Sequence, residues 1–190
     1  MTCSTKTMSW IMIPVILGFF LGSILVRVQL DVSTDLRTIN VGGATGRALV
    51  VYHPGLSDFQ EDVTLAYVEG LVEAGWACDL TTASRQTPMN LENYNLLVLG
   101  APTYEWRPAS PIKRYIERIE DPARVPVALI LTGGGSTAKA ASLFVEYVES
   151  EGGQVVEMLE IWQGAPNEER HGISDPLEIA RQAGATLELP

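Results

Sequence analysis

Ser136 is the residue whose surroundings first suggest chemistry. It lies in the stretch Gly-Gly-Ser-Thr-Ala (134–138), close to the G-x-S-x-G pattern that exposes a nucleophilic serine between a strand and a helix. His171 follows, and Glu160, Glu168 or Glu169 could be the acid, which is the order found in hydrolases. The domain is small for a hydrolase, however, and His171 falls in a polar loop. We therefore expect Ser136 or Thr137 to cap a helix instead.

The sequence lacks the patterns of four other kinds of site. The stretch 52–57 lacks the G-x-G-x-x-G pattern of a dinucleotide site, and the glycines of 42–46 lack the lysine of a phosphate-binding loop. His53 and Ala101 stand where a phosphoacceptor domain needs acidic residues. The chain has two histidines and two cysteines without metal-ligand spacing, so we expect no metal site.

Apolar runs alternate with segments of helical spacing from residue 47 onward. The expected strands are Arg47–Tyr52, Trp76–Thr81, Asn95–Gly100, Val127–Thr132 and Gln154–Ile161. The expected helices are Phe59–Ala74, Ala109–Ile119, Thr137–Ser150 and Asp175–Ala183. This alternation predicts an α/β fold with a doubly wound, five-stranded parallel sheet in the order 2-1-3-4-5. Ligands bind such sheets beyond the carboxyl ends of the strands, which here means loops 53–59, 101–108 and 132–138.

Two of these loops resemble a known family. Gly100–Ala109 reads Gly-Ala-Pro-Thr-Tyr-Glu-Trp-Arg-Pro-Ala, and 132–135 reads Thr-Gly-Gly-Gly. Both are similar to the flavin-ring loops of flavodoxins and related FMN-dependent quinone reductases, and the likeness covers roughly residues 47–185. It implies that FMN is the cofactor and that an aromatic side chain stacks on its ring. The residues implied are Pro102, Thr103, Tyr104, Trp106, Thr132, Gly133 and Gly134.

The first loop departs from that family. Flavodoxins hold the FMN phosphate there with several hydroxyls and backbone N–H groups, but here only Ser57 keeps a hydroxyl, and Pro54 has no N–H. Ser57 and Gln60 also form a capping-box pattern that would use the N–H groups of the helix start. Nearby carboxylates are costly as well: at about 6 Å, one opposes a phosphate charge by about 3 kcal/mol. The acidic residues are Asp58, Glu61 and Asp62.

The net charge limits the possible partners, and the cysteine positions argue against a disulfide. The chain carries a net charge of −10, and since residues 1–46 have a balance of +1, the rest carries −11. Such a domain repels nucleic acid and anionic lipid, although it could dock on a basic protein. Cys3 and Cys78 cannot easily meet, so we expect no disulfide and a buried thiol at Cys78.

An uncharged N-terminal segment predicts a transmembrane helix ahead of the domain. Residues 7–26 carry no charge and, as a helix, would span about 30 Å, the thickness of the hydrocarbon core. A cleaved signal peptide is the alternative, but RVQLDV after Val26 offers no cleavage site. The predicted division is therefore an anchor over 1–28, a linker over 29–46 and a domain over 47–190. Basic residues on both sides of the segment leave its orientation open.

These features together predict a membrane-tethered, FMN-binding electron-transfer protein with a possible redox protein partner. As the resemblance implies, the flavin would do the chemistry, and no side chain would act as acid, base or nucleophile. The alternative is a domain of the same fold that has lost FMN and serves as a binding or scaffold module.

Overall fold

A computed structural model describes residues 13, 30–164 and 175–190. Asp31–Pro190 forms one compact unit, separate from Met1–Leu30. The predicted membrane segment 7–26 lies, apart from Ile13, outside the described residues. Among the residues that are described, no helix has both the length and the apolar character needed to cross a bilayer.

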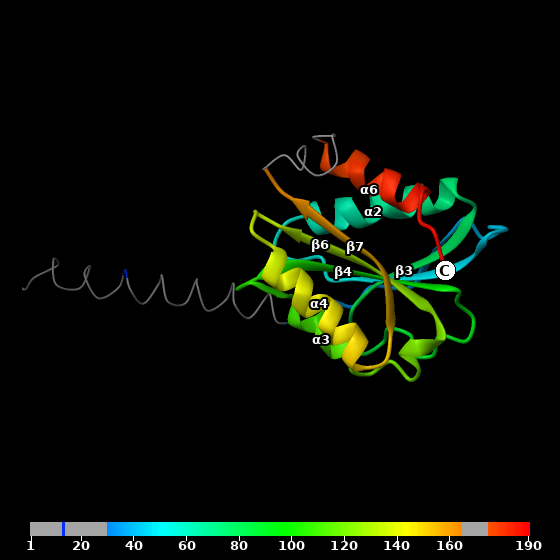
Figure 1. The fold of residues 1–190 in the computed structure, drawn as a ribbon, viewed down its shortest axis with the longest axis horizontal. Coiled ribbons are helices and arrows are strands. Elements are labelled where there is room, and N and C mark those ends of the chain that lie inside the picture. The colour runs from blue at the N-terminus through cyan, green and yellow to red at the C-terminus, as the bar shows by residue number, and fades with distance from the viewer. Residues whose placement is uncertain (1–12, 14–29, 165–174) are drawn as a thin grey trace, which may run out of the picture. The chain divides into compact units, whose positions relative to one another are not determined.

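One sheet forms the centre of the unit (Figure 1). Its strands are β1 (Arg37–Ile39), β2 (Gly46–Tyr52), β3 (Trp76–Thr82), β4 (Leu96–Tyr104), β5 (Arg107–Pro108), β6 (Pro126–Gly133) and β7 (Gln154–Trp162). The parallel strands lie in the order β3-β2-β4-β6-β7, which is the predicted order. The predicted count of five was wrong, because β1 pairs antiparallel with β3 and β5 pairs antiparallel with β4.

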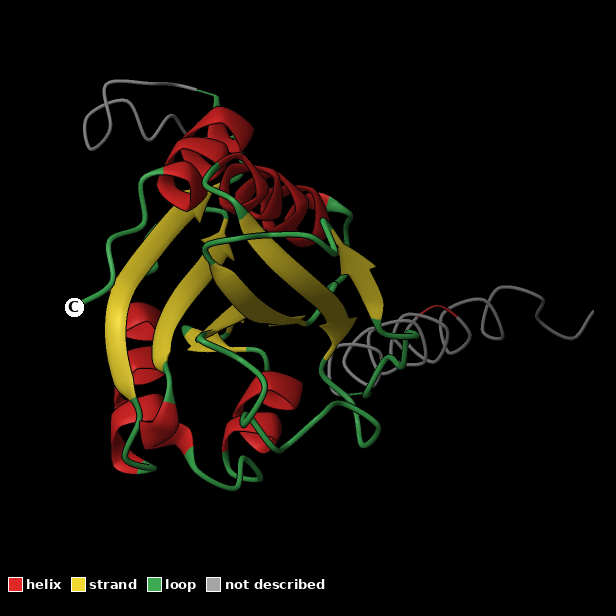
Figure 2. Cartoon of the chain, turned by 90° about the vertical axis from the view of Figure 1, so that its right-hand side faces the viewer, coloured by secondary structure: helices red, strands yellow, loops and turns green. Residues whose placement is uncertain are grey.

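Helices cover both faces of the sheet (Figure 2). α2 (Phe59–Glu73) and α6 (Pro176–Ala185) pack on one face, and α3 (Ser110–Ile116) and α4 (Ala138–Ser150) pack on the other. A short 3-10 helix, η1 (Pro122–Arg124), precedes β6. Because both faces are covered, the central strands are apolar throughout, and Leu96 to Leu99 are fully buried. α3 ends three residues before the predicted Ile119.

Residues 31–46 are part of the fold, contrary to the predicted linker over 29–46. β1 pairs with the outer edge of β3, and Asn40 Nδ2 donates to the carbonyl of Trp76 at 2.9 Å. Thr38 Oγ1 donates to the buried Asp79 carboxylate at 2.6 Å. An uncovered strand edge carries unpaired backbone groups, so even a polar three-residue strand gains by pairing with it.

Two glycines bring α2 and α6 into close contact. A Cβ on Gly70 would lie 1.9 Å from the Arg181 carbonyl, and one on Gly184 would lie 2.1 Å from the Tyr67 carbonyl. Any larger residue at either position would push the helices apart. This packing fixes α2, whose first turn lies at the carboxyl edge of the sheet, where the predicted ligand loops meet.

Candidate functional site at the carboxyl edge of the sheet

A pocket of about 210 Å³ opens beyond the carboxyl ends of β2, β4 and β6. Its wall consists of Pro54, Gly55, Leu56, Ser57, Phe59, Gln60, Pro102, Thr103, Tyr104, Thr132, Gly133, Gly134 and Gln163. The fold thus brings together seven of the eight residues predicted from the sequence, all except Trp106. Their role in ligand binding remains a prediction.

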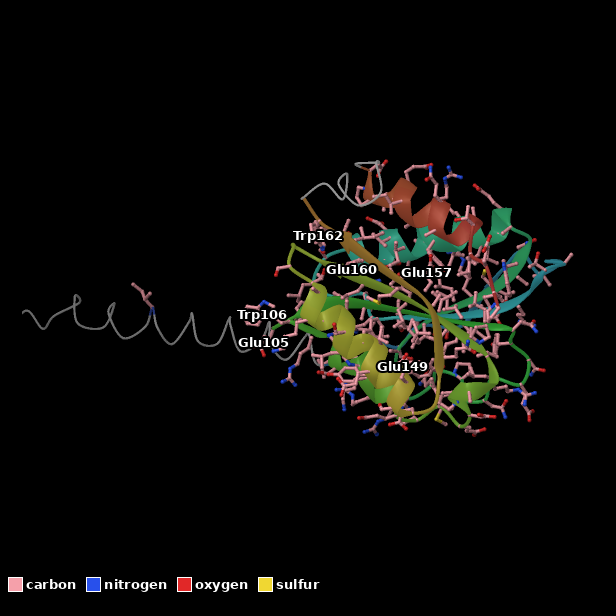
Figure 3. The ribbon with its side chains drawn as sticks, viewed as in Figure 1. Glu105, Trp106, Glu149, Glu157, Glu160 and Trp162 are labelled. Atoms are coloured by element: carbon pink, nitrogen blue, oxygen red, sulfur yellow. The ribbon has the colours of Figure 1, made fainter. Side chains whose placement is uncertain are left out.

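Trp106 lies at the tip of a hairpin beside the pocket. β4 turns directly into β5, and the two residues between them, Glu105 and Trp106, have φ of 50° and 59°. A turn with two positive φ angles normally uses Asn-Gly, and each larger residue there costs about 1–2 kcal/mol. Figure 3 shows Glu105 and Trp106 at the same edge of the sheet as Glu160 and Trp162. Trp106 is 61% exposed, and no local turn motif marks this hairpin in the sequence.

Tyr104 joins the second loop to the first. Its hydroxyl accepts a hydrogen bond from the Leu56 N–H at 2.9 Å. Gly55, with φ of 80°, makes this contact possible, because a Cβ there would lie 2.9 Å from the Tyr104 hydroxyl. Burial raises the pKa of Tyr104, so the phenol is protonated at neutral pH. Tyr104 therefore lines the pocket and connects the two loops through its hydroxyl.

The floor of the pocket is polar and incompletely paired. Gln60, 2% exposed, accepts from Thr132 Oγ1 at 2.7 Å and donates to Thr64 Oγ1 at 3.0 Å. Thr103 Oγ1 is buried beside Gly133 and has no hydrogen-bond partner among the described residues. An unpaired buried hydroxyl costs about 1–3 kcal/mol, and a ligand acceptor in the pocket would remove that cost.

Hydrogen bonds to residues at the end of β7 hold the segment that follows β6. Trp162 Nε1 donates to Thr137 Oγ1 at 2.8 Å, and Thr137 Oγ1 donates to Glu160 Oε2 at 2.5 Å. Thr137 is the N-cap residue of α4 but makes no side-chain cap, so the expected capping bond is not formed there. Glu160 therefore takes part in this hydrogen-bonded chain from Trp162 through Thr137. His171, which would be its partner in the hydrolase alternative, lies outside the described residues.

The start of α2 differs from the expected self-capped helix. Asp58 is the N-cap residue, and its side chain makes no capping bond, so the predicted capping pattern was wrong. Within the described part of the chain, the Asp58 side chain therefore leaves the N–H groups of the first turn uncapped, and such helix starts can bind anions. Ser57 is exposed beside them and lines the pocket.

The three acidic residues near this helix start do not line the pocket. Burial, together with the charge and hydrogen bond of Glu61, raises the pKa of Tyr52 to about 12, so Glu61 interacts with the Tyr52 hydroxyl. Asp62 lines a groove between α2 and α6 instead. Glu61 and Asp62 therefore have neighbours away from the pocket, whereas Asp58 stays exposed at the helix start.

His53 lies outside this pocket, and the described residues form no metal-binding group. His53 is 1% exposed and does not line the pocket, and its N–H donates to the Gly100 carbonyl at 3.0 Å. In the described part of the chain, no three His, Cys, Asp or Glu side chains are grouped so that they could hold a metal ion.

Comparison with known proteins rests on structure. No protein-family model matches the chain, and no curated protein sequence matches it.

Solved structures do match. An NAD(P)H:quinone oxidoreductase from Methanothermobacter marburgensis matches with a TM-score of 0.55 and 17% identity, over 76% of this chain and 96% of that one. The two-electron reduced flavodoxin of Megasphaera elsdenii gives a TM-score of 0.56 and 14% identity, over 74% and 99%. A flavoprotein from Lactobacillus acidophilus, solved in complex with FMN, gives 0.50 and 18%, over 60% and 93%. At these identities the likeness shows the fold alone: the chain has a flavodoxin-like fold.

Proposed function

We propose that this chain is a membrane-tethered, flavodoxin-like protein that binds FMN and transfers electrons. The observation that carries the proposal is the pocket itself, which three separate loops line and in which the buried Thr103 hydroxyl has no hydrogen-bond partner among the described residues. Such sheets bind ligands at this switch point. The FMN complex of the Lactobacillus acidophilus flavoprotein, which has a similar fold, supports the choice of cofactor.

In this proposal, different residues of the pocket bind different parts of FMN. Tyr104 offers an aromatic face to the flavin ring, and Thr103 offers its hydroxyl as a donor. Gly133 and Gly134 leave their backbone accessible, and a Cβ on Gly134 would meet no atom within 4 Å. The bound flavin supplies the redox chemistry, and the chain binds it, orients it and limits its contact with water.

The start of α2 would hold the phosphate. Ser57 and the uncapped first turn offer one hydroxyl and several backbone donors. None of the neighbouring carboxylates lines the pocket. The helix dipole adds about 0.3–1 kcal/mol for an anion at this position.

The tether is the second part of the proposal. Residues 7–26 lack charge over the length that a bilayer requires. A tethered electron carrier suits a redox partner in or at the membrane, because the tether raises the effective concentration of the carrier near that partner. The chain has a net charge of −10, which suits a basic docking surface on that partner.

FMN titration of the detergent-solubilised full chain tests the binding. We expect quenching of flavin fluorescence as the ring stacks on Tyr104, with one FMN bound per chain. The variant Gly134→Leu fills the pocket and should abolish binding, whereas Gly42→Leu should not, because Gly42 is equally open but remote from the pocket. A folded chain that leaves FMN fluorescence unchanged would refute the proposal.

The second candidate function is a binding module that has lost the cofactor. It is favoured by the small pocket, about 210 Å³ against about 300–1,000 Å³ for most ligand sites. The contact between Tyr104 and Leu56 also uses one N–H of the first loop. The same titration decides between the two functions, since this candidate predicts no FMN uptake by a folded chain.

A further inference from the structure

The compact unit begins at the same edge of the sheet as the pocket. Thr34 N–H donates to Thr82 Oγ1 at 3.1 Å, and Thr82 is the last residue of β3. Ser33 Oγ donates to Gln86 Oε1 at 2.8 Å in the loop that follows β3. β1 then runs antiparallel to β3, away from this edge. The chain therefore enters the unit at the carboxyl edge of the sheet.

The segment between the predicted membrane span and the unit is short. From Val26 to Asp31 there are five residue steps, which reach at most about 18 Å when extended. The headgroup layer takes about 6 Å of this length. The seven residues of β3 alone extend about 20 Å. A tether that starts at the carboxyl edge is therefore too short to let the amino edge of the sheet reach the bilayer.

The carboxyl edge also exposes side chains that favour a lipid surface. Leu56, in the pocket wall, is 51% exposed, and Trp106, in the hairpin that follows Tyr104 of that wall, is 61% exposed. Tryptophan prefers the headgroup layer of membranes. Glu105 and Trp106 both have positive φ, so this exposed tryptophan lies in a strained turn.

We propose that the carboxyl edge of the sheet rests on the membrane surface, with Trp106 in the headgroup layer and the pocket opening toward the bilayer. This inference rests on the proposed function, in which residues 7–26 span the membrane. The surface it fits is zwitterionic, because Glu105 and Asp58 are exposed at this edge and the chain has a net charge of −10.

Fluorescent labels on the full chain in phosphatidylcholine vesicles test the proposal. In a Cys3→Ser background, one label is attached through Arg107→Cys at the hairpin and a control label through Val41→Cys. Val41 is 84% exposed, in the turn after β1 at the amino edge. Cys78 does not label, because it is buried and its pKa is raised to about 12. Lipids with a quencher on the headgroup then report how close each label lies to the surface.

The expected result is quenching at residue 107 at least threefold stronger than at residue 41. Adding Trp106→Ser should reduce the quenching at 107, and anionic lipid in the vesicles should reduce it too. Equal quenching at the two positions, or stronger quenching at 41, would overturn the orientation while leaving the tether in place. A chain that does not float with the vesicles would overturn the tether, and this inference with it, whatever its FMN binding.

Discussion

Two polar regions of the same sheet are built in opposite ways. Around Asp79 on β3 every partner is in place: the buried carboxylate accepts from Thr38, from Tyr94 and from the Arg47 side chain. Arg47 also lies over the ring of Tyr94, 5.9 Å from its centroid. At the pocket, by contrast, Thr103 has an unpaired hydroxyl among the described residues, and two residues of the adjacent turn have positive φ.

The difference teaches where polar residues serve the fold and where they serve a ligand. A buried charge is tolerated only when its partners are complete, so the Asp79 cluster joins β1, β2 and β3 and contributes to stability. An unpaired hydroxyl and a strained turn lower stability. Their presence together at the switch point of the sheet is consistent with a site that a ligand completes.

Asp79→Ala is the strongest test of the first region. It removes the acceptor shared by Thr38, Tyr94 and Arg47, and we expect the free energy of unfolding to fall by about 3 kcal/mol. Urea unfolding of the full chain in detergent measures this loss. FMN affinity of the folded protein should stay unchanged, and a loss below about 1 kcal/mol would mean that the cluster is not a stabilising centre.

Thr103→Val contrasts the pocket with that cluster. Removing an unpaired hydroxyl should raise the free energy of unfolding by about 1 kcal/mol and weaken FMN binding about fivefold. Thr132→Val is the matched control, because it removes a hydroxyl that is bonded to Gln60 and should lower stability. Destabilisation by both variants would show that Thr103 is paired after all.

Trp106→Gly tests the strain in the hairpin. Glycine adopts positive φ without steric cost, so we expect the free energy of unfolding to rise by about 1 kcal/mol, although a large side chain is lost. Trp106→Ala separates strain from side-chain loss, since alanine keeps the steric cost. An equal rise of the free energy of unfolding in both variants would point to removal of the exposed indole rather than to release of backbone strain.

Tyr104→Phe carries the smallest expected effect. It frees the Leu56 N–H for a phosphate while keeping the aromatic face. FMN affinity should rise about threefold, and riboflavin, which has no phosphate, should bind as before. Calorimetry with both ligands gives the comparison; an equal change for both would place the effect on the ring rather than on the phosphate.

The sequence by itself determined the architecture and most of the pocket. Short apolar runs such as Leu96–Leu99, bounded by turn residues, are typical of strands buried on both faces, and right-handed connections then leave few orders for the sheet. Residues that follow such strands must meet at one edge, which is why loops 102–104 and 132–134 were found in advance.

The tertiary structure decided what depends on contacts between distant residues. β1 is too short and polar to signal a strand, and it forms because the edge of β3 is available. The hairpin of Glu105 and Trp106 has no local turn signal and is held by the pairing of β4 with β5. The direction of Glu61 and Asp62, toward Tyr52 and toward α6, follows from helix packing. Local patterns fix which segments form strands and helices, but the pairing of side chains far apart in the chain exists only once those elements have packed.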